Sequence, residues 1–508
     1  MRMYKTSVLD FLEDSCERTP ENIAFADPDR EISFAELKRK ARAIGTFFLK
    51  NHIFGKPAAF YMEKSVPAVC ALFGAVYAGA FYSFIDVRQP AARAEKVLSN
   101  LAPAVLITDA EHREAAGEIF PENNIILIDD LMGLSEIDEV GLTSVRRRMT
   151  DTQPLYCNFT SGSTGVPKGV VVSHRSVIEF ISHFVPIFGI REDDVIANQA
   201  PFDFDVSVKD IYSGLLTGAR VQLVPRDYFS NPTVLMDYLC EKKATVLVWA
   251  VSAMCFVSIM NGFSYRTPES IRLVLFSGEV MPPKQYNVWK KALPEAVFVN
   301  LYGPTEITCN CTYYRLEDRL YEKTESIPIG QPFPNEKVFL LSDEDSLVTA
   351  AGVEGEICVS GTCLALGYYR DPERTRAAFM QNPLNKSYDE RMYRTGDIGK
   401  YDEEGRLVYV SRKDFQVKHL GQRIELGEIE IAAMACSGVD RAACLYDAKK
   451  KKILLFYSGS REKGEVDSEL KKALPPYMVP GKTVQMDALP LNKNGKIDRH
   501  ALEESLQK

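Results

Sequence analysis

From about residue 20 to about residue 300, short apolar segments alternate with amphipathic helical patterns. The segments typical of strands are PAAFY, AVLITD, IILID, VIANQAPF, RVQLVP, TVLVWAV, RLVLFSGE and VFVNLYG. Two stretches between them, SFAELKRKARAIGTFFLKN and AARAEKVLSNL, carry apolar residues at helical spacing. Strands that alternate with helices are typical of parallel sheets, because parallel strands need a long crossover connection. The sequence therefore predicts an α/β fold with largely parallel sheets.

The pattern changes in the last third of the chain. From Ile327 to Val410 short strands and turns dominate, as in GEICVSG and GRLVYVS. From about Asp414 two helical stretches and short strands follow, and the segment SRKD at Ser411–Asp414 is the candidate boundary. Because 508 residues are too many for one ordinary core, we expect at least two domains.

Bulk properties exclude several classes of function. A formal net charge of −8 argues against binding to nucleic acids, because their phosphates attract basic surfaces. The eleven cysteines include no CxxC pair, so neither a disulfide framework nor a zinc site is indicated. The N-terminus carries acidic residues within its apolar stretch, which is untypical of a signal peptide. These features predict a cytoplasmic protein.

One uncharged segment, Val66–Ile85, is long enough to span a membrane. It is rich in alanine, glycine, serine and tyrosine, which insert weakly, and it has no sizeable basic flank. The pattern divides at Gly79 into a buried helix and a buried strand. We therefore predict no membrane insertion.

A loop rich in glycine, serine and threonine lies between two apolar runs. It reads NFTSGSTGVPKGVVVSH, from Asn158 to His174, and carries one lysine, Lys168. Small residues bring backbone N–H groups close to an anion, so this composition suits a phosphate. Its spacing is not that of a Walker A loop, and the flanking strands predict a hairpin. Without further motifs, a glycine-rich surface loop is the better interpretation.

Four more segments follow in a fixed order. They are NLYGPTE (Asn300–Glu306), YRTGD (Tyr393–Asp397), KDFQVKHLGQRIELGEIE (Lys413–Glu430) and LPLNKNGKIDR (Leu489–Arg499). Together with the glycine-rich loop they resemble the superfamily of adenylate-forming enzymes, over about residues 8 to 500. That superfamily contains acyl-CoA synthetases, luciferases and the adenylation domains of nonribosomal peptide synthetases. NQAPFDFDVSVKDIY and SGEVMP are similar to amino-acid-activating members, especially D-alanine–carrier-protein ligases.

The resemblance implies a fold and a two-step reaction. A large N-terminal domain, residues 1–410, would contain layered α/β subdomains and a small β-barrel-like subdomain. A hinge at 411–414 would join it to a small mobile α+β C-terminal domain, residues 415–508. A carboxylate would attack the α-phosphate of ATP, and the acyl group would then pass to a phosphopantetheine thiol. Catalysis of the first step is mostly positioning and charge stabilisation, with Mg²⁺ as the expected metal.

The resemblance also assigns residues to the nucleotide. The β- and γ-phosphates would be held by Thr160, Ser161, Gly162, Ser163, Thr164, Gly165 and Lys168. The second motif contributes Asn300, Leu301, Tyr302, Gly303, Pro304, Thr305 and Glu306. Within it, Tyr302 would cover the adenine, Thr305 would contact the α-phosphate and Glu306 would ligate Mg²⁺. Because Thr160 would contact the phosphates and Glu306 would ligate Mg²⁺, both are predicted to be catalytic.

Further nucleotide contacts follow from the same resemblance. Gly278 and Glu279 would border the adenine. Asp397 would accept both ribose hydroxyls, as a carboxylate with two oxygens can, helped by Arg412. The alternative for Asp397 is that it only terminates a turn after Gly396.

Four residues near the C-terminus receive roles in the same way. Lys496, in KNGKIDR, would lie between the α-phosphate and the carboxylate during adenylation and is the main catalytic candidate. Asp414 matches the hinge position of the family. Rotation there would remove Lys496 and present a second face, with Lys418 and Gly421, to the thiol.

The substrate is predicted from a second set of positions. Asp205, in FDFDVS, matches the carboxylate that binds the α-ammonium group in amino-acid-activating members, with Asp203 as the alternative. By resemblance the pocket is lined by Val206, Lys209, Ala250, Leu275, Ser277, Leu301, Cys309 and Asn310. D-alanine ligases commonly carry cysteine at the position of Ser277 and a smaller apolar residue at that of Lys209. D-alanine is the family default, but both departures weigh against it.

Two interpretations of Lys209 remain open. It lies four residues after Asp205, so on a helix the two side chains can form an ion pair. Alternatively, it points into the pocket and binds a polar or acidic side chain.

The sequence thus predicts an amino-acid ligase that uses ATP and Mg²⁺ and loads a stand-alone carrier protein bearing phosphopantetheine. The first alternative is an acyl- or aryl-CoA synthetase of the same fold, which Asp205 disfavours. The second is a nucleotide-binding regulator without catalysis, which has no need of Lys496. The amino acid, its chirality, the carrier and the oligomeric state do not follow from the sequence.

Overall fold

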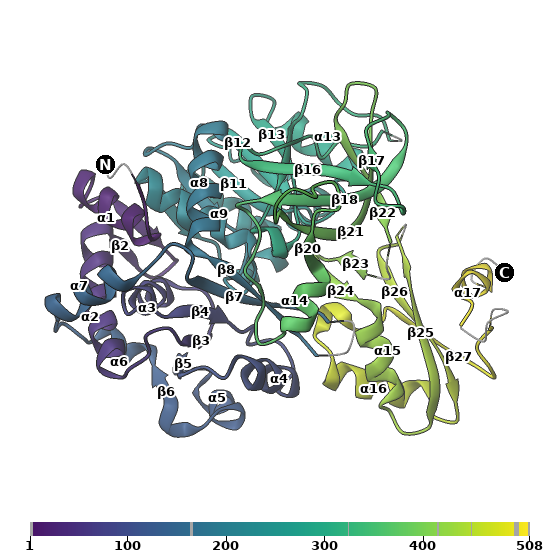
Figure 1. The fold of residues 1–508 in the computed structure, drawn as a ribbon, viewed down its shortest axis with the longest axis horizontal. Coiled ribbons are helices and arrows are strands. Elements are labelled where there is room, and N and C mark those ends of the chain that lie inside the picture. Colours follow the sequence, from purple (N-terminus) through teal and green to yellow (C-terminus); the bar gives the residue numbers. More distant parts are fainter. Residues whose placement is uncertain are drawn as a thin grey trace.

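Two largely parallel sheets and the helices packed on them make up most of the N-terminal part of the chain (Figure 1). The structure is a computed structural model that describes residues 4–162, 166–323, 325–413, 416–448, 450–491 and 497–505. The first sheet has the strand order β15-β14-β13-β12-β11-β9-β10-β1-β2. Its strands are β1 (Ile23–Ala26), β2 (Glu31–Ser33), β9 (Val195–Asn198), β10 (Arg220–Leu223), β11 (Val246–Ala250), β12 (Leu273–Ser277), β13 (Val297–Tyr302), β14 (Thr312–Arg315) and β15 (Gln331–Pro332). Only β2, β14 and β15 pair antiparallel to their neighbours.

The second sheet has the order β19-β8-β7-β4-β3-β5-β6. Its strands are β3 (Pro57–Tyr61), β4 (Phe81–Phe84), β5 (Val105–Thr108), β6 (Ile125–Leu127), β7 (Pro154–Thr160), β8 (Lys168–Ser173) and β19 (Gly367–Tyr368). β7 and β8 pair antiparallel, with Thr160 opposite Lys168, so the glycine-rich loop joins two strands of a hairpin as predicted.

Helices cover both sheets and separate them. They are α1 (Leu9–Arg18), α2 (Phe34–Lys50), α3 (Val66–Tyr77), α4 (Ala91–Leu101), α5 (Arg113–Ile119), α6 (Ile128–Met132), α7 (Glu139–Arg148), α8 (His174–Phe188), α9 (Val206–Thr217), α10 (Pro232–Glu241), α11 (Val251–Ile259), α12 (Gly262–Tyr265) and α13 (Pro283–Ala292). Short 3₁₀ turns lie at Glu122–Asn124, Arg226–Ser230, Thr305–Ile307 and Pro476–Met478.

The uncharged segment Val66–Ile85 forms helix α3 and strand β4, as predicted. The Ser65 hydroxyl caps α3 by accepting a hydrogen bond from the Ala68 N–H, and every residue of the helix is buried. α2 packs closely on it, because a Cβ on Gly74 would lie 2.4 Å from Ile44 Cγ2. Overpacking of this kind typically costs about 1–3 kcal/mol. Among the described residues, no helix is both long and apolar enough to cross a bilayer.

An antiparallel sheet follows between residues 336 and 412. Its strands are β16 (Glu336–Leu341), β17 (Leu347–Val348), β18 (Glu354–Gly361), β20 (Phe379–Gln381), β21 (Arg391–Tyr401) and β22 (Leu407–Arg412), and α14 (Pro372–Ala378) precedes β20. The order is β17-β16-β18-β21-β20, with β22 on β21. Because β22 runs to Arg412, the predicted hinge at 411–414 begins inside a strand; Asp414 lies outside the described residues.

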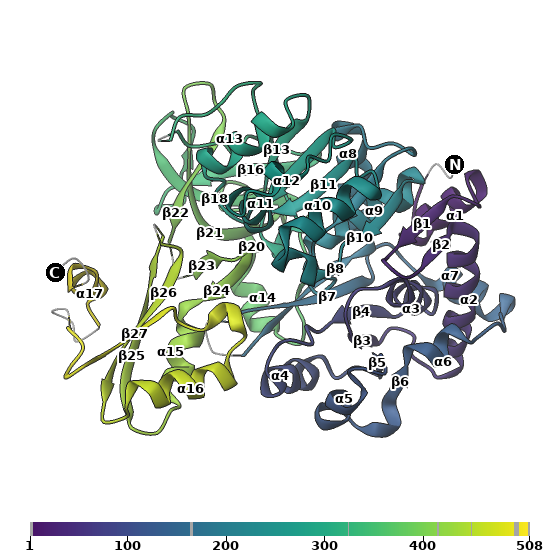
Figure 2. The same cartoon turned by 180° about the vertical axis from the view of Figure 1, so that it is seen from behind.

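The C-terminal domain, from Gln416 onward, has its own apolar core, in which Ile424, Leu455 and Val466 are buried together. Its elements are the hairpin β23 (Gln416–His419) and β24 (Gln422–Glu425), the sheet β25 (Val439–Asp447), β26 (Lys452–Gly459) and β27 (Lys482–Met486), and helices α15 (Leu426–Met434), α16 (Lys463–Ala473) and α17 (Arg499–Ser505). Figures 1 and 2 show the hairpin against the rest of the chain and α17 at the outer end. The predicted α/β fold with a small C-terminal domain is confirmed.

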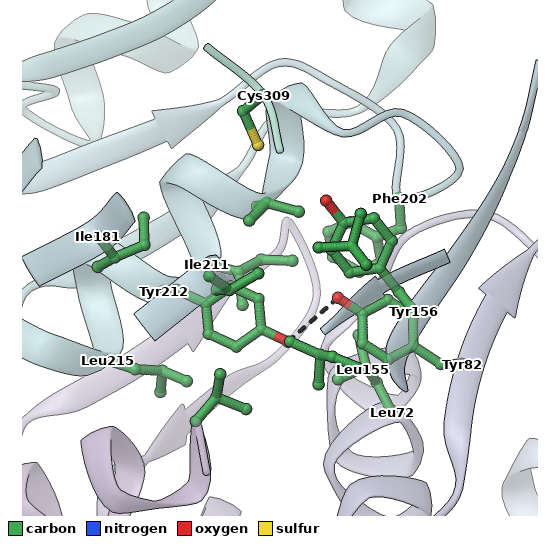
Figure 3. Close-up of a cluster of buried hydrophobic side chains, with 14 of the residues drawn as sticks. Leu72, Tyr82, Leu155, Tyr156, Ile181, Phe202, Ile211, Tyr212, Leu215 and Cys309 are labelled. Atoms are coloured by element: carbon green, nitrogen blue, oxygen red, sulfur yellow. Dashed lines mark hydrogen bonds between the residues drawn. The ribbon is translucent and has the colours of Figure 1, made fainter. Parts of the chain in front are cut away.

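A buried cluster joins the two parallel sheets behind the site (Figure 3). The hydroxyl groups of Tyr82 on β4 and Tyr212 on α9 lie 3.1 Å apart and satisfy one another. Tyr156 on β7 stacks at a tilt on Tyr82, with ring centroids 5.7 Å apart. Cys309 borders this cluster and also lines the cavity described next, so the packed cluster fixes one wall of the site.

Candidate active site

A cavity lies between the N-terminal sheets and the hairpin of the C-terminal domain. Of the predicted site residues it is lined by Thr160, Ser161, Asp205, Val206, Ser277, Gly278, Gly303, Pro304, Thr305, Cys309, Asp397, Arg412, Lys418 and Gly421. They come from the ends of β7, β12 and β13, from the start of α9, from β21 and β22, and from the β23–β24 hairpin. Segments far apart in sequence therefore meet at one cavity.

The glycine-rich loop contributes one wall of this cavity. The Thr160 hydroxyl is buried and finds no partner in the described part of the chain, so it is available to a ligand oxygen. Ser161 instead donates a hydrogen bond to the Arg423 carbonyl, 2.9 Å away. Gly162 has no room for a side chain, because a Cβ would lie 2.1 Å from the Val166 carbonyl oxygen. Ser163, Thr164 and Gly165 lie outside the described residues.

Glu306 is the centre of a buried ion network. Its Oε1 accepts hydrogen bonds from Lys168 Nζ at 3.0 Å and from the Tyr368 hydroxyl at 2.9 Å. Its Oε2 accepts from Arg423 Nη1 at 2.6 Å. Burial raises the pKa of Glu306, but the two cations outweigh it and hold that pKa well below its ordinary value. Burial lowers the pKa of Lys168, and Glu306 partly offsets that effect.

These contacts decide whether Mg²⁺ fits here. The ion needs oxygen ligands at about 2.0–2.1 Å in octahedral geometry. Both carboxylate oxygens of Glu306 already accept bonds from cationic donors, Lys168 and Arg423. A second cation at the same oxygens is opposed by charge as well as space. In this arrangement the residues around Glu306 do not fit a divalent metal, contrary to the predicted role.

The predicted ribose contact, Asp397, is 1 % exposed and lies inside strand β21. Its Oδ1 accepts from Arg412 Nη1 at 2.8 Å, and its Oδ2 accepts from the Tyr302 hydroxyl at 2.6 Å. A carboxylate has about four acceptor positions, so each oxygen retains one. The simple turn after Gly396 is therefore the wrong interpretation, and the arrangement suits two ligand hydroxyls.

The predicted adenine contacts meet the C-terminal hairpin. Lys418 Nζ lies 5.4 Å from the Tyr302 ring centroid, so it covers that ring. Burial lowers the pKa of Lys418. Gly278 has a φ of +96°, a backbone conformation that favours glycine. The neighbouring Glu279 accepts a hydrogen bond from the Gly421 N–H, at 2.5 Å, and binds Lys451 Nζ at 2.9 Å.

Asp205 is 8 % exposed and borders the cavity at the start of α9. Thr305 donates a hydrogen bond to its carboxylate. Burial raises the pKa of Asp205, and Lys209 offsets part of that effect. No lysine or arginine of the described chain lies within ion-pair distance of it, so the carboxylate has room for a cationic ligand group.

Lys209 is fully buried on α9 beneath the cavity. Its Nζ donates to Asn310 Oδ1 at 2.6 Å and to Ser277 Oγ at 3.4 Å. Both partners are predicted pocket residues and neither is a carboxylate. The direct ion pair with Asp205 is therefore not formed. Burial lowers the pKa of Lys209, and Cys309 and the nearby carboxylates partly offset that effect.

The other predicted pocket residues lie behind the lining. Leu275, Leu301 and Asn310 are buried. Ala250 faces Gly421, because a Cβ on that glycine would lie 3.4 Å from the Ala250 Cβ. Asn300 is also buried, and its side-chain amide donates a hydrogen bond to the Pro328 carbonyl oxygen at 2.9 Å. This contact joins two segments of the chain.

Lys496 lies outside the described residues. The described helix that follows it, α17, is at the outer end of the C-terminal domain in both views (Figures 1 and 2). Lys418 and Gly421 line the cavity. Their role toward the thiol stays a prediction.

Three further residues join the site although the sequence did not single them out. Arg423 on β24 binds Glu306, and Arg93 on α4 forms a buried ion pair with Glu428 on α15. Arg93 and Tyr477 also line the cavity, at an end shared with Asp86 and Gln89. Arg423 belongs to the segment GQRIE of a recognised motif, which was the available signal. No motif around Arg93 indicates that this residue belongs to the site.

Comparisons with known proteins agree with this geometry. The family model described as AMP-binding enzyme matches residues 12–369. L-proline--[L-prolyl-carrier protein] ligase of Streptomyces coelicolor is 32% identical over 520 residues, covering 98% of this chain and 96% of that protein. Tyrocidine synthase 1 of Brevibacillus parabrevis is 29% identical over 507 residues, covering 98% of this chain but only 45% of that protein.

A solved structure with the same fold is the Vibrio cholerae adenylation domain AlmE in complex with glycyl-adenosine-5'-phosphate. It superposes with a TM-score of 0.84 at 22% identity, covering 100% of this chain and 99% of that one. At this identity the likeness concerns the fold.

Proposed function

Because this chain belongs to the family of AMP-binding enzymes, we propose that it adenylates an amino acid with ATP and transfers the aminoacyl group to a carrier protein. The first product is an aminoacyl-adenylate, and the acceptor is a phosphopantetheine thiol on a carrier supplied in trans. Relatives named as amino acid–carrier protein ligases support both halves of this proposal.

One observation carries the choice of an amino acid over another carboxylic acid. The carboxylate of Asp205 is buried at the cavity and lacks a cation from the described chain. A buried, unpaired carboxylate is costly, and an α-ammonium group would neutralise it. A fatty or aromatic acid would offer no such group.

Exchange of pyrophosphate with ATP tests this proposal directly. A panel of amino acids and their des-amino analogues should show exchange only where the ammonium group is present. Asp205→Asn should remove exchange with the best amino acid while AMP binding persists. Preferred activation of des-amino acids by the unmodified enzyme would instead establish an acyl- or aryl-CoA synthetase.

The residues assigned to ATP have geometry that supports the proposal. The orphaned hydroxyl of Thr160 can donate to a phosphate oxygen, and Asp397 keeps one free acceptor position on each oxygen for the ribose. When bound, ATP supplies the adenylyl group that activates the substrate carboxylate, and pyrophosphate is the leaving group. The chain orients it through these contacts and through Lys168, while Lys496 remains the proposed cation of the adenylation step.

The chemistry of the pocket supports a polar or acidic side chain on the substrate. Lys209 places a buried ammonium group behind Ser277 and Asn310, with two hydrogen-bond partners for three donors. A substrate carboxylate or amide would provide the missing acceptor, whereas an alanine methyl group would not. D-alanine is the default of the family, but these contacts favour a polar or acidic amino acid.

The position of two hairpin residues supports a role of the C-terminal domain in the transfer step. Lys418 and Gly421 border the cavity, and the end lined by Gln89, Arg93 and Tyr477 provides space for a thiol arm. Location in the cytoplasm is part of the proposal, since ATP is the cosubstrate and all eleven cysteines are free.

A further inference from the structure

Asp203 is a second carboxylate at the wall of the cavity, two residues before Asp205. It lies in the turn that precedes α9, which the Phe204 N–H closes by donating a hydrogen bond to the Pro201 carbonyl at 3.2 Å. Apart from its own backbone N–H, no hydrogen-bond donor within the described ranges contacts the Asp203 carboxylate. Its oxygens are therefore available to accept a proton or a hydrogen bond from a ligand.

The neighbouring carboxylate of Asp86 also lines the cavity, but it is already paired. Its Oδ1 accepts hydrogen bonds from Arg226 Nη1 at 2.9 Å and from the Arg88 N–H at 3.0 Å. Asp203 has no ion pair of its own in the described part of the chain. Of these two carboxylates, Asp203 is thus the one left to act on a ligand.

The surroundings of Asp203 favour its protonated form. Burial and the negative charge of Asp86 raise the pKa of Asp203 to about 7, and Arg226 offsets part of that rise. The buried ammonium group of Lys64 lies nearby but donates to backbone carbonyl oxygens. A carboxylate with such a pKa can take up a proton at neutral pH and release it again. The charged and titratable groups around Asp203 are Glu63 and Lys64 after β3, Asp86 after β4, Arg226, and Tyr477 of the C-terminal domain.

Asp203 also acts on the end of the cavity that is proposed for the thiol arm. Arg93 and Tyr477 line that end. Burial raises the pKa of Tyr477 to about 12; Arg93 opposes that rise, and the negative charge of Asp203 adds to it. Asp205 would hold the α-ammonium group, whose nitrogen is two bonds from the reacting carbonyl carbon. Asp203 thus lies beside both the thiol end and the residue that would position the carbonyl.

We propose that Asp203 is the general base of the transfer step and takes the proton from the incoming thiol. The thiolate is the nucleophile in such a reaction. As the S–H proton passes to an Asp203 oxygen, the sulfur forms a bond to the carbonyl carbon. The C–O bond to the phosphate of the adenylate breaks, and its electron pair leaves with AMP. The proton on Asp203 then returns to solvent. The inference rests on the proposed function and deepens its second half.

The test compares Asp203→Asn with the unmodified protein in each half-reaction. ATP, pyrophosphatase and the best amino acid of the exchange panel load the enzyme with aminoacyl-adenylate. Free pantetheine is then added, and thioester formation is timed by quenched flow. Asp203→Asn should slow this transfer about 100-fold at pH 7, the lower end of what a general base contributes. Pyrophosphate exchange should be unchanged, because no thiol takes part in it.

The pH profile of transfer distinguishes a base from a structural residue. In Asp203→Asn the rate should follow ionisation of the thiol and rise about tenfold per pH unit up to about pH 8.5, the ordinary thiol pKa. In the unmodified protein the rate should rise only through the pKa of Asp203 and then level off, because the base must be ionised to accept a proton. The two rates should therefore converge as pH rises. A loss of transfer that is independent of pH overturns the proposal.

Glu63→Gln is the matched control. Glu63 lies on a second, smaller cavity that Asp203 also lines, and its carboxylate binds Arg88 Nε at 3.2 Å. This variant removes the same charge from the same neighbourhood and should keep the transfer rate and its levelling-off. Equal loss of exchange and transfer in Asp203→Asn would mean that Asp203 binds the α-ammonium group or shapes the site, which overturns its role as a base.

The remaining outcomes separate this inference from the proposed function. Normal exchange together with transfer that Asp203→Asn leaves unchanged refutes the base alone. If no amino acid of the panel supports exchange, the proposed function fails and the base falls with it. The profile of the unmodified protein needs no substitution: a transfer rate that rises steadily up to the pKa of the thiol refutes the base, even if Asp203→Asn does not fold.

Discussion

Replacing Lys209 by methionine tests whether this lysine selects an acidic amino acid or has no role in substrate preference. The side chain is fully buried, and its Nζ bonds to Asn310 Oδ1 at 2.6 Å and Ser277 Oγ at 3.4 Å. Methionine fills nearly the same volume, so loss of packing costs less than about 1.5 kcal/mol. Losing the charge-assisted bond to Asn310 costs about 1.5–3 kcal/mol, but removing a buried charge offsets part of it. We therefore expect Lys209→Met to fold.

Its effect on catalysis depends on the substrate. For an acidic amino acid, the variant leaves a buried substrate carboxylate without its cation, which costs about 2–5 kcal/mol. That corresponds to a loss of roughly 30- to 4,000-fold in kcat/KM, at about 1.4 kcal/mol per factor of ten. For alanine, the variant removes an unsatisfied ammonium group, so kcat/KM should be unchanged or higher.

The assay is pyrophosphate exchange with aspartate, glutamate, their amides and both enantiomers of alanine. Lys64→Met is the matched control, because Lys64 Nζ is also enclosed but donates to the carbonyl oxygens of Asn198 (2.9 Å) and Gln199 (2.8 Å). These partners belong to the segment that leads to Asp205, which binds the α-ammonium group common to all amino acids in the proposed function. Lys64→Met should therefore lower exchange for every amino acid alike. A strong preference for alanine in both the unmodified enzyme and Lys209→Met would refute a role of Lys209 in selection.

Three further outcomes are expected. Lys496→Ala should abolish pyrophosphate exchange but largely preserve thioester formation from pre-made aminoacyl-adenylate; equal loss of both steps would contradict the assigned role. Arg93→Met leaves Glu428 buried without its partner in the arrangement seen here, a cost of about 3–5 kcal/mol, so transfer to the carrier should slow while exchange persists. Burial lowers the pKa of Lys209 below 10.5, and a bound acidic side chain should raise it again, so above the lowered pKa binding should take up protons and weaken as pH rises. Calorimetry in buffers of different ionisation enthalpy measures that uptake, and Lys209→Met should lack it.

The sequence predicted much of the local structure and the lining of the cavity. The hairpin β7–β8, the division of Val66–Ile85 into a helix and a strand, and the parallel sheets followed from apolar periodicity and turn residues. Asp205 and Asp397 were identified through motifs and both line the cavity. These features depend on residues close together in the chain, which a sequence displays directly.

The polar contacts within the cavity did not follow from the sequence. Lys209 was expected either to pair with Asp205 or to point into the pocket; it contacts Ser277 and Asn310, which lie 68 and 101 residues away, and its contact with a substrate stays a prediction. Glu306 was expected to face a metal, and it faces Arg423, 117 residues later. For Lys209 a short-range partner, Asp205, was weighed. The partners seen for Lys209 and Glu306 depend on how distant elements pack.

The sequence by itself determined the type of the strands and helices that it singled out, the family and the chemical groups that the site contains, because periodicity, turn residues and motifs are local properties of the chain. Only the tertiary structure decided which of these groups touch. The attraction between two charges acts across the distance between packed elements, and burial strengthens that attraction. The position of the C-terminal hairpin, which carries Arg423, therefore decides the partner of Glu306. The ion pair of Arg93 with Glu428 joins residues 335 positions apart. Glu428 lies in a recognised motif, but no local pattern marks Arg93 as its partner. Such pairs exist only once both domains have folded and met.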